Sequence, residues 1–156
     1  MPVVDCSTGE TRDFTSEELA ALEPGLDALR AAKLAAIDAR LGAALAAGAP
    51  VTVGEAVLHV ALDEGSRADM GAMATTALAA ASEAVPWPES YQAGWIAMEN
   101  VRIPLATPAA GLGLAAGVGD HYAQLRQHAR DLKDAALAAE DVVDLDAIDI
   151  KVGWAV

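Results

Sequence analysis

Residues 107–139 carry the sequence TPAAGLGLAAGVGDHYAQLRQHARDLKDAALAA, which predicts a long helix. Thr107 suits the N-cap because its hydroxyl accepts a backbone N–H, and Pro108 suits the first helical position because no donor is needed there. The first turns are rich in glycine, and each glycine disfavours a helix by up to about 1 kcal/mol relative to alanine. We therefore expect either a close helix crossing or a frayed start, and a firm helix from Asp120 onward. Its expected apolar anchors are Tyr122, Leu125, Leu132 and Leu137.

Two β-hairpins are predicted before this helix. Residues 51–62 contain β-prone runs on either side of a Gly54-Glu55 turn, and residues 95–105 contain similar runs on either side of Glu99-Asn100. In the second hairpin, alternation predicts a shared buried side. The side chains assigned to that side are Ile96, Met98, Val101 and Ile103.

Two further helices are predicted from apolar residues spaced three and four apart. The first covers residues 26–47 and ends at Gly48, a residue type favoured just past helix C-termini. The second runs from Ser66, taken as its N-cap, to about Glu83. The first helix carries the stripe Leu34, Ile37, Leu41 and Leu45, and the second carries Met70, Met73, Ala77 and Ala81.

The two ends of the chain give shorter signals. Residues 2–6 and 11–14 predict a strand arm, and Thr15 with Glu18 forms a capping box that opens a helix. Near the other end, Asp144 is the expected N-cap of one helical turn. The predicted class is α+β, mostly helical, with three main helices, two short hairpins and an N-terminal strand arm. We expect two units, residues 1–48 for docking or oligomerisation and residues 51–156 as a compact domain.

The composition excludes some classes of function. The 156 residues are 54% hydrophobic but only 4% aromatic, and the net charge is −13. Such an acidic chain is a poor nucleic-acid binder, because phosphate neutralisation needs clustered Lys and Arg. The first residues lack the basic and apolar regions of a secretion signal, and no apolar run reaches membrane-spanning length. We expect a soluble protein made in the cytoplasm.

Candidate reactive residues are few. Cys6 is the single cysteine, which excludes an internal disulfide and a cysteine metal site. His121 and His128 lie seven residues apart on a predicted helix, with Asp131 nearby, but a metal site needs a further ligand. His59 lies in a predicted strand. The acidic residues Asp144, Asp146 and Asp149 lack the glycine and glutamate of a calcium loop. We therefore assign no catalytic, cofactor-binding or metal-binding residue.

The candidate functional residues are contact residues instead. Large apolar groups are scarce in this chain, and such groups often anchor protein interfaces. For Trp154, close to the end of the chain, the core and an interface with a neighbouring subunit remain alternatives. The interface candidates are Phe14, Leu34, Ile37, Leu41, Trp87, Trp95 and Trp154.

A series of short motifs extends through the chain: VVDCSTGE at 3–10, VTVG at 51–54, ENV at 99–101 after Trp95, LKDA at 132–135, and LDAIDI at 145–150 followed by Gly153-Trp154. In these motifs the chain resembles an uncharacterised domain family found at the C-terminus of short tail proteins of tailed bacteriophages. It departs from that pattern in the segment WPES at 87–90 and in its glycine-rich helix start. The family has no assigned chemistry, so the resemblance transfers no catalytic residue.

The resemblance implies a non-enzymatic virion protein of the phage tail, located in the baseplate or beside a tail fibre. Such a protein anchors or bridges neighbouring tail subunits and forms a homo-oligomer, with no nucleic acid and no membrane insertion. Two alternatives are a tail-fibre assembly chaperone absent from the mature particle and a capsid decoration protein. A third, from another class, is a small enzyme or metal-binding protein built on His121, His128 and the carboxylates.

Overall fold

The computed structural model describes residues 3–4, 11–13, 15 and 24–154. The capping box at Glu18 and the interface candidate Phe14 lie outside this part of the chain, and so does most of the predicted strand arm. The described elements, in order, are β1 (Val3–Val4), β2 (Thr11–Arg12), α2 (Leu26–Ala47), β3 (Ala49–Val53), β4 (Ala56–Val60), α3 (Glu64–Ala81), α4 (Glu89–Gln92), β5 (Trp95–Ile96), β6 (Arg102–Ile103), α5 (Pro108–Ala138) and α6 (Val142–Ala147).

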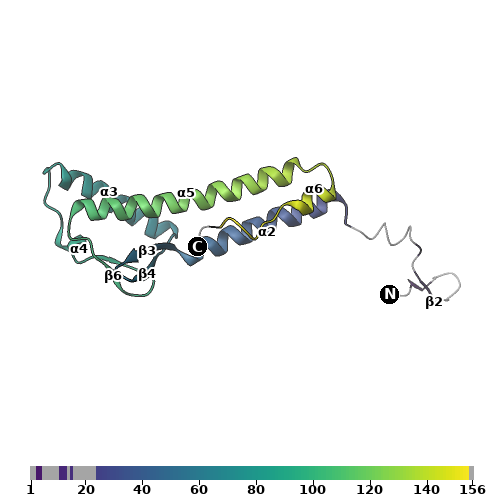
Figure 1. Ribbon diagram of the computed structural model, residues 1–156, viewed down its shortest axis with the longest axis horizontal. Helices are drawn as coiled ribbons and strands as arrows, with labels where there is room; N and C mark the ends of the chain where they lie inside the picture. Colours follow the sequence, from purple (N-terminus) through teal and green to yellow (C-terminus); the bar gives the residue numbers. More distant parts are fainter. Residues whose placement is uncertain (1–2, 5–10, 14, 16–23, 155–156) are drawn as a thin grey trace.

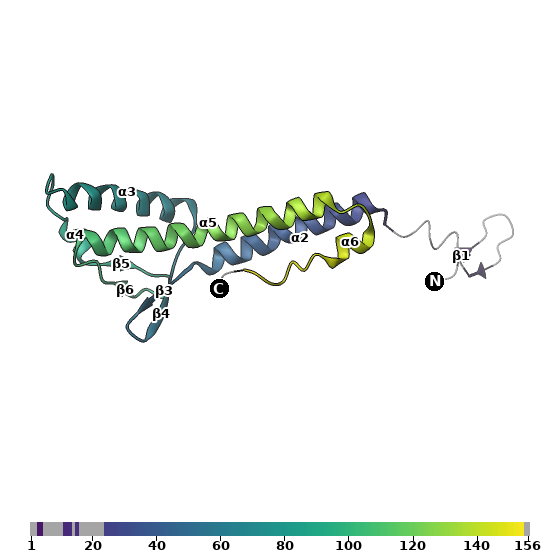
Figure 2. The ribbon, with the colours of Figure 1, turned by 45° about the horizontal axis from the view of Figure 1, so that its top comes forward.

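The fold is α+β and mostly helical, as predicted, with α5 as its long axis. In Figures 1 and 2, α3 packs along the N-terminal half of α5 and α2 along its C-terminal half. The hairpins β3–β4 and β5–β6 lie together near the junction of these helices, and both are antiparallel. The molecule is therefore elongated.

The predicted limits of α2 are confirmed. It begins at Leu26 and ends at Ala47, and the N–H of Gly48 donates to the carbonyl of Leu45 at 3.2 Å. Of its predicted stripe, Ile37 and Leu41 are fully packed against the core. A glycine is required after the helix because residue 48 has φ +82° and ψ 172°, a region that L side chains avoid.

The cap predicted for α3 is wrong. Its N-cap is Asp63, whose carboxylate accepts from both the backbone N–H and the hydroxyl of Ser66. Asp63 is the cap in place of Ser66 because it lies three residues before that N–H, which is the spacing that a side-chain cap needs. These bonds also lower the pKa of Asp63, with the Ser66 hydroxyl as the main cause. Met70, Met73 and Ala77 are buried as predicted, whereas Ala81 is exposed at the end of the helix.

The buried side predicted for the second hairpin is also wrong. Ile103 is buried, but Ile96, Met98 and Val101 are 57%, 50% and 49% exposed. In the ladder, Ile96 stands opposite Arg102, so this pair shares the outer face. The strands are too short for the alternation to persist through the turn, where Asn100 adopts φ +59°.

In α5 the predicted Thr107–Pro108 start is confirmed, and the Thr107 hydroxyl accepts from the N–H of Ala110. Leu125 is buried as predicted, but Leu137 is 57% exposed on the solvent side. The helix is continuous from Pro108, so the glycines do not mark a frayed start. Gly111 instead lies in close contact with Trp87, which precedes α4, since a Cβ there would stand 3.1 Å from the Trp87 ring.

We expect Gly113→Ala and Gly117→Ala each to raise the free energy of unfolding by about 0.5–1 kcal/mol, because nothing lies within 4 Å of a Cβ at either position. Gly111→Ala should lower it by about 1 kcal/mol by crowding Trp87. Denaturant unfolding measures both effects. A gain from Gly111→Ala as large as that from Gly113→Ala would contradict the close contact with Trp87.

The short helix α6 is capped by Asp141, whose carboxylate accepts from the N–H of Asp144. The prediction of Asp144 as the cap is therefore wrong, although one helical segment does form. Leu145 is the buried residue of α6, and Ile148 and Ile150 of the following segment pack against the core.

One contiguous core joins α2 with the elements that follow it. Ile37 and Leu41 belong to the same cluster as Leu58 and Val60 of β4 and Leu125 of α5. The proposed split between residues 1–48 and 51–156 thus falls within a shared core. None of the helices in the described ranges combines the length and hydropathy needed to cross a bilayer.

Candidate functional site

A groove opens where three distant segments meet: the C-terminal half of α2, the hairpin β3–β4 and the last described residues. Its volume is about 280 Å³. We call it the basic groove, because it brings together cationic or titratable nitrogens and an indole, with no carboxylate among the residues that line it. These residues are Arg40, Ala43, Ala44, Ala47, Gly48, Pro50, His59, Lys151 and Trp154.

The cations of the basic groove differ from most others in the described residues. Arg30 pairs with Asp27, Lys133 with Asp38, and Arg130 with Asp134. The remaining lysine and arginine side chains donate to backbone carbonyls, with three exceptions in residues 24–154 for which the structure shows no hydrogen bond or ion pair. These exceptions are Arg40, Lys151 and Arg126, of which the first two line the groove.

Trp154 forms one wall of the groove and is fixed on two sides. Its Nε1–H donates to the carbonyl of Ile150 at 2.9 Å, and its ring meets His128 edge-on with centroids 4.8 Å apart. His128 Nε2 lies 3.0 Å from the carbonyl oxygen of Val152. Trp154 is therefore half-buried against its own chain, with part of the indole left open to the groove.

His59 is held at the edge of the groove by Glu99. One carboxylate oxygen accepts from the His59 backbone N–H at 3.0 Å, and the other lies 2.7 Å from Nδ1. The backbone bond is the main cause that lowers the pKa of Glu99. The N–H of Met98 also donates to the His59 carbonyl at 2.8 Å, so β4 is tied to the second hairpin by main chain and side chain.

We expect Glu99→Gln to loosen this link at neutral pH. Because the pKa of Glu99 is lowered in the folded state, its stabilisation is present above a glutamate's ordinary pKa and disappears as the pH falls through the lowered value. The stability difference between wild type and Glu99→Gln should thus vanish in acid, as measured by denaturant unfolding across pH. Glu55→Gln, at the exposed turn of β3–β4, is the control and should show no such difference.

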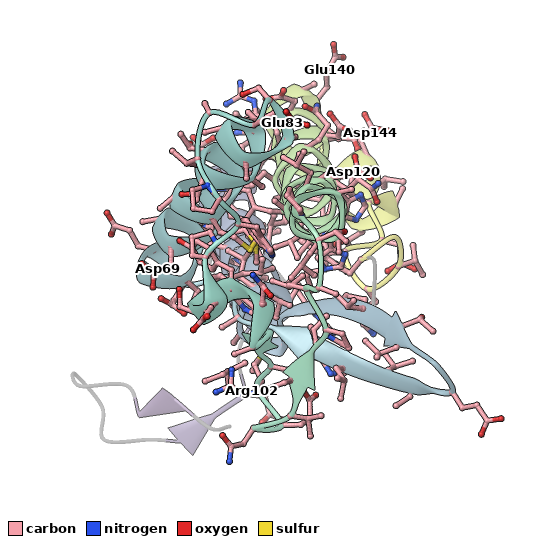
Figure 3. The ribbon with its side chains drawn as sticks, turned by 90° about the vertical axis from the view of Figure 1, so that its left-hand side faces the viewer. Asp69, Glu83, Arg102, Asp120, Glu140 and Asp144 are labelled. Atoms are coloured by element: carbon pink, nitrogen blue, oxygen red, sulfur yellow. The ribbon has the colours of Figure 1, made fainter. Side chains whose placement is uncertain are left out.

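A second surface feature lies on the hairpins. Val57 of β4 is 54% exposed, Ile96, Met98 and Val101 of the second hairpin are exposed to a similar degree, and a backbone bond joins Met98 to His59 of β4. We call these four residues the hairpin patch. Several large apolar side chains exposed on neighbouring hairpins make this region a candidate contact site. Exposed carboxylates are spread over several elements, among them Asp69, Glu83, Asp120, Glu140 and Asp144, which are labelled in Figure 3.

The predicted interface residues fall into two groups. Ile37 and Leu41 are buried in the chain's own core, and Leu34 packs against it. The tryptophans are half-buried: Trp87 donates to the Leu105 carbonyl at 2.8 Å and stacks on Tyr91, and Trp95 stands opposite Ile103.

The three histidines do not converge. His121 is partly buried, its Nε2 has no hydrogen-bond partner, and burial lowers its pKa. His128 and His59 lie in the contacts described above. Within the described ranges, no group of three His, Cys, Asp or Glu side chains is placed to hold a metal ion.

The basic groove was not predicted. Arg40 and Lys151 lie far apart in the sequence, and no local pattern marks either as a ligand-binding residue. One signal was available in the sequence: cations are scarce in a chain of net charge −13. A lysine or arginine without an acidic partner in such a chain is therefore a candidate for binding an acidic group.

Comparison with known proteins gives one finding. Neither the curated proteins nor the solved structures contain a match to this chain. A protein-family model does match over residues 28–152, which covers α2 through the segment after α6. On that match, the chain belongs to the family described as "Domain of unknown function (DUF4376)".

Proposed function

We propose that this protein is a non-enzymatic structural component of a bacteriophage tail, in the baseplate or beside a tail fibre, that anchors or bridges neighbouring subunits. The observation that carries the proposal is the hairpin patch, four large apolar side chains exposed on the two hairpins. Val57 and Met98 are fixed there through the bonds of β4 and Glu99, so the patch is preformed. A preformed apolar surface limits the entropy that binding costs.

The resemblance of the motifs at 51–54, 99–101 and 145–150 to phage tail proteins supports the tail location. The elongated form supports a bridging role, because the hairpin patch and α6 lie at separate places along the axis of α5 (Figure 2). An acidic surface keeps such a component from binding nucleic acid during assembly.

Mass spectrometry of purified particles tests the proposal. We expect peptides of this chain in particles produced from the genome that encodes it, at a constant ratio to known tail proteins. Particles that lack the chain while infected cells contain it would instead indicate an assembly chaperone. Peptides that remain with tailless heads would indicate a capsid decoration protein.

Variants of the hairpin patch test the surface itself. We expect Ile96→Ser and Val101→Ser to fold normally, because both side chains are about half-exposed, and to reduce incorporation into particles about tenfold, as for loss of an apolar anchor at an interface. Leu78→Ser on α3, equally exposed but away from the hairpins, is the matched control. Equal incorporation of all three variants would contradict the role of the patch.

A further inference from the structure

We propose that the basic groove is a self-association site that receives the acidic segment at α6 of a second copy of this chain. We call residues 140–146, with the sequence EDVVDLD, the acidic knob. The proposal rests on the proposed function, in that it names a surface through which an oligomeric structural protein contacts its own copies.

The chemistry of the groove specifies its occupant. Arg40 and Lys151 supply unpaired positive charge, and the alanines of α2 with Trp154 supply an apolar wall. Arginine and lysine cations favour a carboxylate, which forms charge-assisted hydrogen bonds with both side-chain types. The wall favours an apolar side chain placed beside that carboxylate. The occupant is therefore an acidic segment that also presents an apolar group.

The acidic knob has both features. Val143 is 76% exposed, more than any other large apolar side chain of the described residues, and Val142 is 40% exposed. The carboxylates of Glu140, Asp144 and Asp146 are exposed around them, and Figure 3 shows Glu140 and Asp144 directed away from the body of the molecule. Because Asp141 caps α6, the knob has a fixed conformation before it meets a partner.

The position of the two features suits a two-fold dimer. The acidic knob lies beside the N-terminal part of α2 and the groove beside its C-terminal part, and residues 148–154 run between them along the same helix (Figures 1 and 2). A two-fold axis that passes beside α2, perpendicular to it and midway between the two features, therefore places each knob at the groove of the other copy. Such an isologous contact closes on itself and uses both sites twice. The helix α2, along which both sites lie, is about 33 Å long, at roughly 1.5 Å for each of its 22 residues.

The charge of the chain favours a copy of itself in this orientation. Because each copy carries a net charge of −13, two copies repel each other over most of their surfaces. The groove is the place where unpaired cations of one copy meet carboxylates of the other. The same charge pattern makes the contact weaker at high salt.

A charge-swap experiment tests the contact. Lys151→Glu places a carboxylate in each groove, and Asp144→Lys places a cation on each knob. We expect either variant alone to self-associate about tenfold or more weakly than wild type, since like charges then face each other. In an equimolar mixture, one groove–knob contact is native and the other is exchanged but attractive. The mixture should therefore form heterodimers with an affinity close to that of wild type, as measured by analytical ultracentrifugation.

The matched control is Arg126→Glu, which makes the same charge change at an exposed cation of α5 outside the groove. It should leave self-association unchanged, and circular dichroism should show all variants folded. A wild type that stays monomeric over a wide concentration range would overturn the proposal, as would variants that associate like wild type or a mixture that fails to associate. The chain's presence in particles is measured separately, so a monomer found in particles would overturn this inference and leave the proposed function standing.

Discussion

Replacing Gly48 by valine should lower the free energy of unfolding by about 3 kcal/mol, because two costs of roughly 1–3 kcal/mol each combine at this position. With φ +82° and ψ 172°, the backbone lies in a region that only glycine adopts readily. A Cβ would also stand 2.6 Å from Met98 Sδ and 2.8 Å from the Val60 carbonyl oxygen. Denaturant unfolding followed by circular dichroism measures the change.

Gly42→Ala is the control for this variant. Gly42 lies in α2, only six residues before Gly48 in the numbering of the chain, yet nothing lies within 4 Å of a Cβ there. Alanine is favoured over glycine in a helix, so this variant should gain about 0.5–1 kcal/mol. A Gly48→Val protein as stable as wild type would contradict the crossing between the end of α2 and the second hairpin.

Ile37→Ala should lower the free energy of unfolding by about 3 kcal/mol, within the range for deleting a buried aliphatic side chain. Ile37 of α2 is fully buried against the elements that pack on this helix. Its truncation therefore leaves a cavity in the shared core. If residues 1–48 were a separate docking unit with Ile37 at its interface, the same substitution would weaken association and leave the rest of the chain stable. Unfolding curves followed by near-ultraviolet circular dichroism, which reports on the tryptophans, distinguish these two results.

Leu78→Ala provides the comparison, because Leu78 on α3 is 61% exposed and contributes little to the core. We expect a change of less than about 0.5 kcal/mol, as for surface substitutions in general. Loss of α2 alone in Ile37→Ala, with α3 and α5 still folded, would support the prediction that residues 1–48 are an independent unit.

Part of the candidate site depends on the same packing. Gly48 and His59 both line the basic groove, and Glu99 holds His59 from the second hairpin. A variant that opens the crossing at Gly48 therefore also displaces one edge of the groove. For this reason the charge variants of Lys151 and Asp144, both exposed, are the better tests of binding.

Sequence reasoning found the features that depend on a few adjacent residues. Thr107 and Pro108 start α5, Gly48 ends α2, and the turn at Gly54-Glu55 closes the first hairpin. Each of these signals acts through backbone groups within one helical turn or one hairpin loop, so it can be recognised without knowing the rest of the fold.

The predictions that proved wrong concern places where the local sequence allows two arrangements of the chain. Ser66 and Asp144 are both good cap residues, yet Asp63 and Asp141 cap the helices, each from three residues earlier. In the second hairpin, alternation alone places Ile96 on the wrong side, because the position of α5 and β4 decides which face is covered.

The sequence by itself determined the helices, their principal stops and the class of fold, because caps, glycines and apolar spacing act over a few residues. Only the tertiary structure decided which apolar side chains remain exposed and which cations remain unpaired. Arg40, His59 and Lys151 meet because α2, β4 and the final segment pack together around α5. Such proximity results from packing between segments far apart in the chain, and no local pattern encodes it.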